Sequence, residues 1–186
     1  MTKHYKNIFK TELLILLIII PFISACKHIT TENKHNNVPL SEYEKPLQDV
    51  NRYLVKKDND RIKSFIRRKH WKMKQTQTGL WYQIYERSSD TLMPVLNDLI
   101  ELSYKVYLLD GTLCYTSDST GTKKFIVGHG GVEAGLEEAV LMLHRGDKAR
   151  FIMPPYLAHG LLGDQNKIPA RSIIIYNIQL LTINGN

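Results

Sequence analysis

The sequence predicts an α+β domain that follows a helical extension. Between residues 80 and 183, several short segments either alternate apolar and polar side chains or are almost continuously apolar, as strands are. One segment among them, Val132–Leu143, instead repeats apolar residues at helical spacing. One short helix among about five antiparallel strands is an α+β arrangement, with the helix laid on one face of the sheet.

The first 26 residues have the pattern of a secretory signal. Three lysines precede position 11, and Leu13–Ile20 is an unbroken apolar run. The apolar stretch that ends at Ala25 has 13 residues and contains Pro21, whereas a membrane-spanning helix needs about 20. We therefore expect a signal peptide over residues 1–26 rather than a permanent anchor helix.

The segment Ile23-Ser-Ala-Cys26 resembles the bacterial lipobox, in which the cysteine becomes the lipidated first residue of the mature protein. This resemblance implies a lipoprotein of the bacterial cell envelope, attached to the membrane through Cys26. The alternative is an ordinary signal peptide followed by an unrelated cysteine. Lipidation of Cys26 leaves Cys114 as the other of two cysteines, so no intramolecular disulfide is expected. The apolar neighbours of Cys114 predict a buried thiol.

Residues 27–40 are polar and predict a flexible tether. After them, Ser41 and Glu44 form a helix-starting capping box. Apolar residues then repeat at helical spacing until a polar run at residues 56–60 interrupts them. We expect helices over 41–55 and 60–70, with one longer helix as the alternative.

The chain carries a formal net charge of +7, and part of this charge is concentrated before the domain. Lys56–Lys74 holds nine lysines and arginines against two aspartates. An exported chain seldom meets nucleic acid, so no nucleic-acid partner is expected. A solvated helix face explains the charge, and weak attraction to anionic lipid headgroups is the other interpretation.

The elements of the domain follow in order. Asp110-Gly111 is a strong hairpin signal between strands. The helix over Val132–Leu143 is expected to end before Gly146. The strand over Lys148–Met153 is expected to end at Pro154-Pro155. Strands are expected over Leu80–Tyr85, Leu99–Leu109, Lys124–Val127, Lys148–Met153 and Ser172–Ile183.

The second half of the chain contains a series of motifs in a fixed order. They are Tyr104-Lys-Val-Tyr-Leu-Leu-Asp-Gly111, Lys124-Phe-Ile-Val-Gly128, Val132-Glu-Ala-Gly-Leu-Glu-Glu138, Arg145-Gly-Asp-Lys-Ala-Arg150, Pro155-Tyr-Leu-Ala-His-Gly160, Ile168-Pro169 and Ser172-Ile-Ile-Ile-Tyr-Asn-Ile-Gln-Leu-Leu181. In this order and spacing they resemble the FKBP-type peptidyl-prolyl cis-trans isomerase family over residues 76–186. The resemblance implies a curved antiparallel sheet wrapped around a short helix, with residues 41–75 as a helical extension before it. Helical extensions in other envelope proteins of this family form dimers, so a homodimer through residues 41–75 is one alternative here.

The resemblance also implies a pocket that receives the proline ring of a protein substrate. The backbone N–H of Glu133 would receive a substrate carbonyl, and His159 would replace a tyrosine that hydrogen-bonds the substrate. Plain core packing is the alternative for the apolar positions, and a loop histidine is the alternative for His159. The implied pocket positions are Tyr104 on the sheet wall, Phe125 and Val132 at the sides, Leu136 on the floor, Ile168 at the entrance, Tyr176 at the back and Cys114 in place of a phenylalanine.

Two features depart from the family pattern. Tyr115 stands where an acidic residue usually helps to orient the pocket, and it cannot supply that negative charge. The loop Leu161–Lys167 does not match in length, so its contacts stay unassigned. Cys114 and Tyr115 therefore favour a weaker catalyst than the family pattern implies.

The resemblance implies a peptidyl-prolyl cis-trans isomerase that assists the folding of cell-envelope proteins without a cofactor or metal. The layout of lipobox, basic helix and isomerase domain is similar to that of gliding-motility-associated isomerase lipoproteins of Bacteroidetes. A non-catalytic chaperone or adaptor with the same fold is the alternative, because Cys114 and Tyr115 depart from the family pattern at pocket positions that affect catalysis.

Overall fold

The computed structural model describes the backbone of residues 40–185 and the side chains from residue 44 onward. The predicted signal peptide, with Cys26, and nearly all of the predicted tether lie outside the described residues. In the part of the chain that is described, no helix combines the length and the apolar character needed to cross a membrane.

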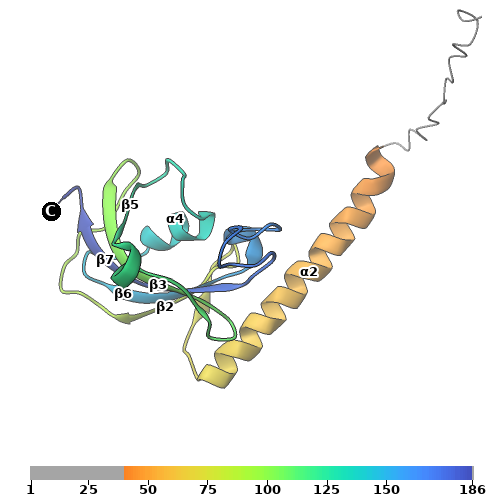
Figure 1. The fold of residues 1–186 in the computed structure, drawn as a ribbon, viewed down its shortest axis with the longest axis horizontal. Coiled ribbons are helices and arrows are strands. Elements are labelled where there is room, and N and C mark those ends of the chain that lie inside the picture. The colour runs from red at the N-terminus through yellow and green to blue at the C-terminus, as the bar shows by residue number, and fades with distance from the viewer. Residues whose placement is uncertain (1–39, 186) are drawn as a thin grey trace, which may run out of the picture. The chain divides into compact units, whose positions relative to one another are not determined.

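The described residues form an α+β fold, as the sequence predicts (Figure 1). Seven strands make one antiparallel sheet, which is two more than the sequence analysis expected. The additional elements are short, and their few residues carry little periodic signal. In chain order, the elements are α2 (Leu40–Lys69), β1 (Lys74–Gln75), β2 (Trp81–Glu86), β3 (Leu99–Leu108), β4 (Leu113–Thr116), α3 (Ser117–Thr120), β5 (Lys123–Ile126), α4 (Ala134–Val140), β6 (Lys148–Met153), the 3₁₀ helix η1 (Pro155–Leu157) and β7 (Ile174–Ile183).

The sheet is built around its last strand. Its order is β1-β2-β6-β7-β3-β4, and β5 pairs with the other half of β3. In the register, Tyr176 of β7 lies opposite Val106 of β3 on one side and Phe151 of β6 on the other. Strand β7 therefore joins the two halves of the sheet.

Both faces of the sheet are covered in its central part. On one face, β7 places Ile174, Tyr176 and Ile178 in the apolar core that includes Leu136 of α4. On the other face, Ile175 belongs to a second apolar cluster with residues of α2. A strand buried on both sides reads as a continuous apolar run rather than an alternating one, which explains the sequence of β7.

The expectation of two helices before the domain is wrong, because α2 is one helix of 30 residues. The polar run that was expected to break it contains Asp58, which is only 5% exposed. Its carboxylate accepts a hydrogen bond from Arg171 at 2.8 Å and also lies 3.9 Å from Arg61. The polar residue thus anchors the helix to the domain instead of ending it.

The short helix α4 is shorter than predicted, because Glu133 has extended backbone angles and acts as its N-cap. After Val140 the chain continues as a turn, in which Leu143 donates to the carbonyl of Val140 at 3.2 Å. The carboxylate of Glu137 accepts from the backbone N–H groups of Gly128 and Gly130, at 2.8 and 3.1 Å. These bonds attach the glycine-rich turn before α4 to the helix itself.

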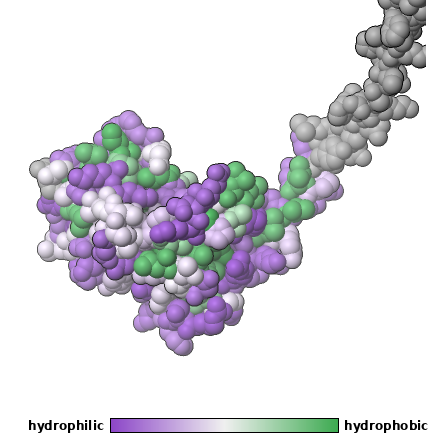
Figure 2. All heavy atoms as spheres, viewed as in Figure 1, coloured by the Kyte–Doolittle hydropathy of each residue, from purple (hydrophilic) through white to green (hydrophobic). Residues whose placement is uncertain are grey.

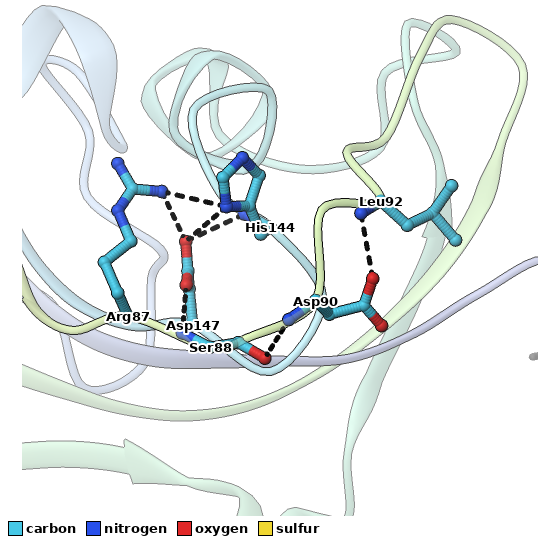
Figure 3. Close-up of polar contacts among 6 residues, drawn as sticks. All are labelled: Arg87, Ser88, Asp90, Leu92, His144 and Asp147. Carbon is cyan, nitrogen blue, oxygen red and sulfur yellow. Dashed lines mark hydrogen bonds and ion pairs between the residues drawn. The ribbon is translucent and has the colours of Figure 1, made fainter.

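A fully buried carboxylate, Asp147, fixes the turn between α4 and β6 (Figure 3). It accepts hydrogen bonds from the backbone N–H groups of Ser88 and His144, both at 2.8 Å. Arg87 donates to the same carboxylate at 2.7 Å and shields its charge. Through these contacts the segment after β2 is held against the turn before β6, although the two are almost sixty residues apart.

Candidate functional site

The floor of the candidate site is α4, which lies very close to the sheet. Leu136, a residue of α4, is fully buried. A Cβ atom on Gly135 would lie 2.9 Å from the carbonyl oxygen of Leu157 and 2.9 Å from the sulfur of Met153. Glycine at this position therefore allows α4 to approach β6 and η1, which brings Leu136 into the core beside the strands.

Two tyrosines from neighbouring strands form the wall beside this floor. The ring centres of Tyr104 in β3 and Tyr176 in β7 are 6.1 Å apart, and the rings are tilted by 41°. The hydroxyl of Tyr104 is 2.8 Å from that of Thr120, so α3 helps to orient it. Tyr176 is 1% exposed and lies deeper in the same core.

A charged network, rather than a purely apolar lining, surrounds the hydroxyl of Tyr176. This hydroxyl donates to Glu133 Oε1 at 2.8 Å, and His159 Nε2 lies 3.1 Å from the same oxygen. Lys123 Nζ donates to the Tyr176 hydroxyl at 3.2 Å and is 3.7 Å from Glu133 Oε2. Burial, followed by the charge of Glu133, raises the pKa of Tyr176, so its hydroxyl stays protonated and able to donate.

The predicted pocket residues fall together around this site. The hydroxyl of Tyr176 and the imidazole of His159 both contact Glu133 Oε1. Tyr104, Tyr115 and Val132 pack against the apolar core from its edge. Ile168 is 2% exposed and lies within the core instead of at an open entrance. The predicted positions that are buried in this one core are Cys114, Phe125, Leu136, Ile168 and Tyr176.

Cys114 is a free, buried thiol, as predicted. Its sulfur lies 3.6 Å from the carbonyl oxygen of Lys167, so the thiol touches the loop that the sequence left unassigned. Burial raises the pKa of Cys114, which keeps it protonated and poorly reactive. Cys114 therefore acts as a small core residue.

Asp164 is a site residue that the sequence analysis missed. The hydroxyl of Tyr115 donates to its carboxylate, and this bond raises the pKa of Tyr115. The other carboxylate oxygen accepts from the backbone N–H groups of Asn166 and Ile168, at 2.9 and 2.7 Å. A negative charge is thus present beside Tyr115, but it comes from the loop and not from the strand.

Lys123 is the second residue that the sequence analysis missed. It lies two positions before Phe125 on β5, so the two side chains share one face of the strand. That alternation is a signal in the sequence, but lysines in strands are mostly exposed, so it does not by itself indicate a site residue. In the structure, Lys123 lies against the rings of Tyr104 and Tyr176.

Another cavity, of about 780 Å³, is lined by none of the site residues named above. It is an open groove between α2 and the β3–β4 turn. Lysines and arginines of α2 form much of its wall, and Asp60 and Asp110 also face it. Its cationic lining consists of Lys56, Lys57, Arg61 and Arg68. The groove therefore suits anionic groups and is unrelated to the apolar site.

Comparison with known proteins identifies the family of this domain. A family model described as FKBP-type peptidyl-prolyl cis-trans isomerase matches residues 91–181. The chain is 33% identical over 101 residues to FK506-binding protein 2 of Dictyostelium discoideum, covering 54% of this chain and 76% of that protein.

Two further relatives are longer proteins. The chain is 31% identical over 112 residues to the FKBP-type peptidyl-prolyl cis-trans isomerase FkpA of Aeromonas hydrophila, covering 60% of this chain and 40% of that one. It is 27% identical over 100 residues to peptidyl-prolyl cis-trans isomerase FKBP9 of Homo sapiens, covering 53% of this chain and 18% of that one. The residues that the family model matches contain α4, the tyrosine wall and the Asp164 loop. Because the chain is also 33% identical to FK506-binding protein 2 over 76% of that protein, it belongs to the FKBP-type peptidyl-prolyl cis-trans isomerase family.

Proposed function

We propose that the protein is a peptidyl-prolyl cis-trans isomerase whose pocket lies between α4 and the tyrosine wall. The observation that carries this proposal is the meeting of Tyr104, Leu136 and Tyr176 in one core within the family domain. Proline-containing protein segments are the proposed substrates. Neither a metal nor a cofactor has a role in the proposed reaction.

The proposed mechanism follows from the physics of the amide bond. Rotation about an X–Pro bond breaks amide resonance, with a barrier of about 18–20 kcal/mol. The twisted amide is less polar than the planar one, so a site that excludes water favours it. The backbone N–H of Glu133 and the side chain of His159 would hold the flanking carbonyl groups while one side rotates.

We further propose that this activity serves proteins of the bacterial cell envelope. The support is the sequence pattern of the first 26 residues, with a lipid on Cys26 and a polar tether after it. A link to gliding motility rests on the similar layout of lipobox, basic helix and isomerase domain. Membrane fractionation of a Cys26→Ser variant tests the anchor, and a variant that stays in the membrane would contradict it.

The catalytic proposal is tested with a protease-coupled assay on a proline-containing peptide. The full chain is expected to accelerate isomerisation, and Tyr104→Ala and Tyr176→Ala are expected to reduce kcat/KM by at least about tenfold, or about 1.4 kcal/mol. Circular dichroism of each variant checks that the fold is kept. If the wild-type chain does not accelerate isomerisation of the peptide, the catalytic proposal is refuted.

A specific observation also favours the alternative, a binding module or chaperone without turnover. Lys123 and Glu133 bring two charges to a site whose chemistry benefits from an apolar lining. Such a protein is expected to suppress aggregation of an unfolded client that contains no proline, without any isomerase activity. Faster isomerisation of the peptide, together with unchanged aggregation of that client, would exclude the alternative.

A further inference from the structure

The side chain of Lys123 lies against the tyrosine wall of the candidate site. It is 26% exposed, and its Nζ is 5.3 Å from the ring centre of Tyr104 and 5.7 Å from that of Tyr176. These distances are within the range of favourable cation–π contacts. An ammonium group therefore occupies the space beside both rings of the tyrosine wall.

The surroundings of Lys123 explain why the ammonium stays there. The side chain of Glu133 is 7% exposed, and its Oε2 atom is buried without a hydrogen-bond partner among the described residues. A buried carboxylate needs a compensating positive charge, and Lys123 Nζ lies 3.7 Å from this oxygen. The hydroxyl of Tyr176 accepts a further hydrogen bond from the same ammonium at 3.2 Å.

We propose that Lys123 is a built-in occupant of the pocket, which a prolyl segment must displace before its ring contacts the two tyrosines. The inference rests on the proposed function, because it assumes that the pocket receives proline. The ammonium and an apolar ring cannot occupy the same space beside Tyr104 and Tyr176. Displacement gives up the contacts of Lys123 with both rings and with Glu133, so it weakens the binding of a prolyl peptide.

The proposal predicts that the pocket binds proline better without this side chain. The full chain and its variants are titrated with the tetrapeptide Ala-Leu-Pro-Phe, blocked at both ends, by isothermal calorimetry. Lys123→Ala is expected to bind the peptide about three- to tenfold more tightly than the wild type. Lys123→Met, which keeps the length but not the charge, is expected to change affinity in the same direction.

Lys124→Ala is the matched control. Lys124 is the next residue on β5, its side chain is 61% exposed, and it pairs with Glu101 at 3.4 Å on the other face of the strand. Its replacement is expected to leave the peptide affinity unchanged. An equal gain in Lys124→Ala would show a general effect of positive charge and would overturn the proposal.

A second readout follows Lys123 directly. The Nζ atom of Lys123 lies 5.3 and 5.7 Å from two aromatic ring centres, so the NMR signal of the neighbouring ε-methylene protons is expected upfield of other lysines. This signal is expected to be absent in Lys123→Met. Saturation with the tetrapeptide is expected to return this signal to the position of an exposed lysine. A signal that stays upfield in the bound state would contradict displacement.

The outcomes separate this inference from the proposed function. Tighter binding by Lys123→Ala without isomerisation by either protein would support the inference and reject catalysis. Isomerisation by the wild type with equal affinity in Lys123→Ala would support catalysis and reject the inference. Failure of both proteins to bind the peptide would overturn the displacement claim.

Discussion

Three buried carboxylates hold together parts of the chain that are far apart in sequence. Asp58 joins α2 to Arg171, and Asp147 joins the end of β2 to the turn before β6. Glu133 joins the start of α4 to β7 through Tyr176. Each of these side chains is at least nine-tenths buried, so its oxygens need the donors that the protein supplies.

Replacement of Asp147 is expected to destabilise the protein strongly. Asp147→Ala leaves the backbone N–H groups of Ser88 and His144 without their acceptor, at a cost of about 2–4 kcal/mol. Urea unfolding followed by circular dichroism measures the change in the free energy of unfolding. Arg52→Ala is the control, because Arg52 is 77% exposed and pairs with the exposed Asp49, so its loss is expected to cost less than about 1 kcal/mol. Equal losses in the two variants would contradict this account.

The contact between Tyr115 and Asp164 predicts a pH dependence of the loop. Burial opposes the charge of Asp164, but hydrogen bonds from Tyr115 and from the backbone of Ile168 and Asn166 prevail and lower its pKa. A carboxyl group with a lowered folded-state pKa stabilises the fold above its unfolded-state pKa, about 3.9, and loses this effect as the pH falls through the folded value. The loop is therefore expected to stay ordered at pH 5 and to loosen below about pH 3.9.

A single variant tests this linkage. Tyr115→Phe removes one donor to Asp164, so the pKa of Asp164 is expected to rise toward its ordinary value. NMR titration of the carboxyl carbon of Asp164 measures the midpoint directly. Tyr107→Phe, a partly exposed position on β3, serves as the control. An unchanged Asp164 midpoint in Tyr115→Phe would rule out the proposed hydrogen bond.

The sequence predicts residues of this site unevenly, for a physical reason. Tyr104 and Tyr176 stand on long strands whose apolar pattern defines their direction, so their convergence follows from the order of the motifs. Lys123 was missed because a short strand with a lysine usually turns that lysine to solvent. Asp164 was missed because its place depends on the path of a loop, which no periodicity encodes.

At the scale of elements, α2 is the part of the structure that the sequence predicted least well. Its C-terminal half packs on the sheet through a small apolar cluster, in which Phe65 meets Trp71 edge to face at 5.4 Å. A helical pattern with polar residues in the middle looks like two helices, since the sequence does not show that Asp58 is paired. The five expected strands match β2, β3, β5, β6 and β7 closely because turn residues flank them, whereas the short strands β1 and β4 were not expected.

Docking of α2 is expected to contribute to stability. Phe65→Ala removes a ring that is 5% exposed, and the cavity is expected to cost about 3 kcal/mol. Thermal unfolding and urea unfolding both measure the loss. Leu47→Ala on the same helix is the control, because Leu47 is 65% exposed and its truncation is expected to cost less than about 0.5 kcal/mol. Unchanged stability of Phe65→Ala would mean that α2 is not docked in solution.

At the scale of the whole molecule, α2 exposes apolar residues in its N-terminal half (Figure 2). Leu47, Val50 and Tyr53 are spaced at intervals of three, and each is more than half exposed. Such a stripe is suited to a second copy of the same helix. We propose that two chains pair through this stripe.

Self-association through this stripe is measured by light scattering. The wild-type chain is expected to have twice the mass of one chain, and Val50→Glu is expected to give a single chain. Val95→Glu is the control, because Val95 is also exposed but lies in the loop before β3. A wild-type mass of one chain would disprove the pairing.

The central position of β7 has a consequence for how the chain acquires its fold. This strand lies between β6 and β3, yet it is the last of the seven in sequence. During synthesis from the N-terminus, β1, β2 and β6 have no connection through the sheet to β3, β4 and β5 until residues 174–183 are made. A chain truncated before that segment is left with two unjoined ribbons, each with an open edge that is prone to pair with other chains.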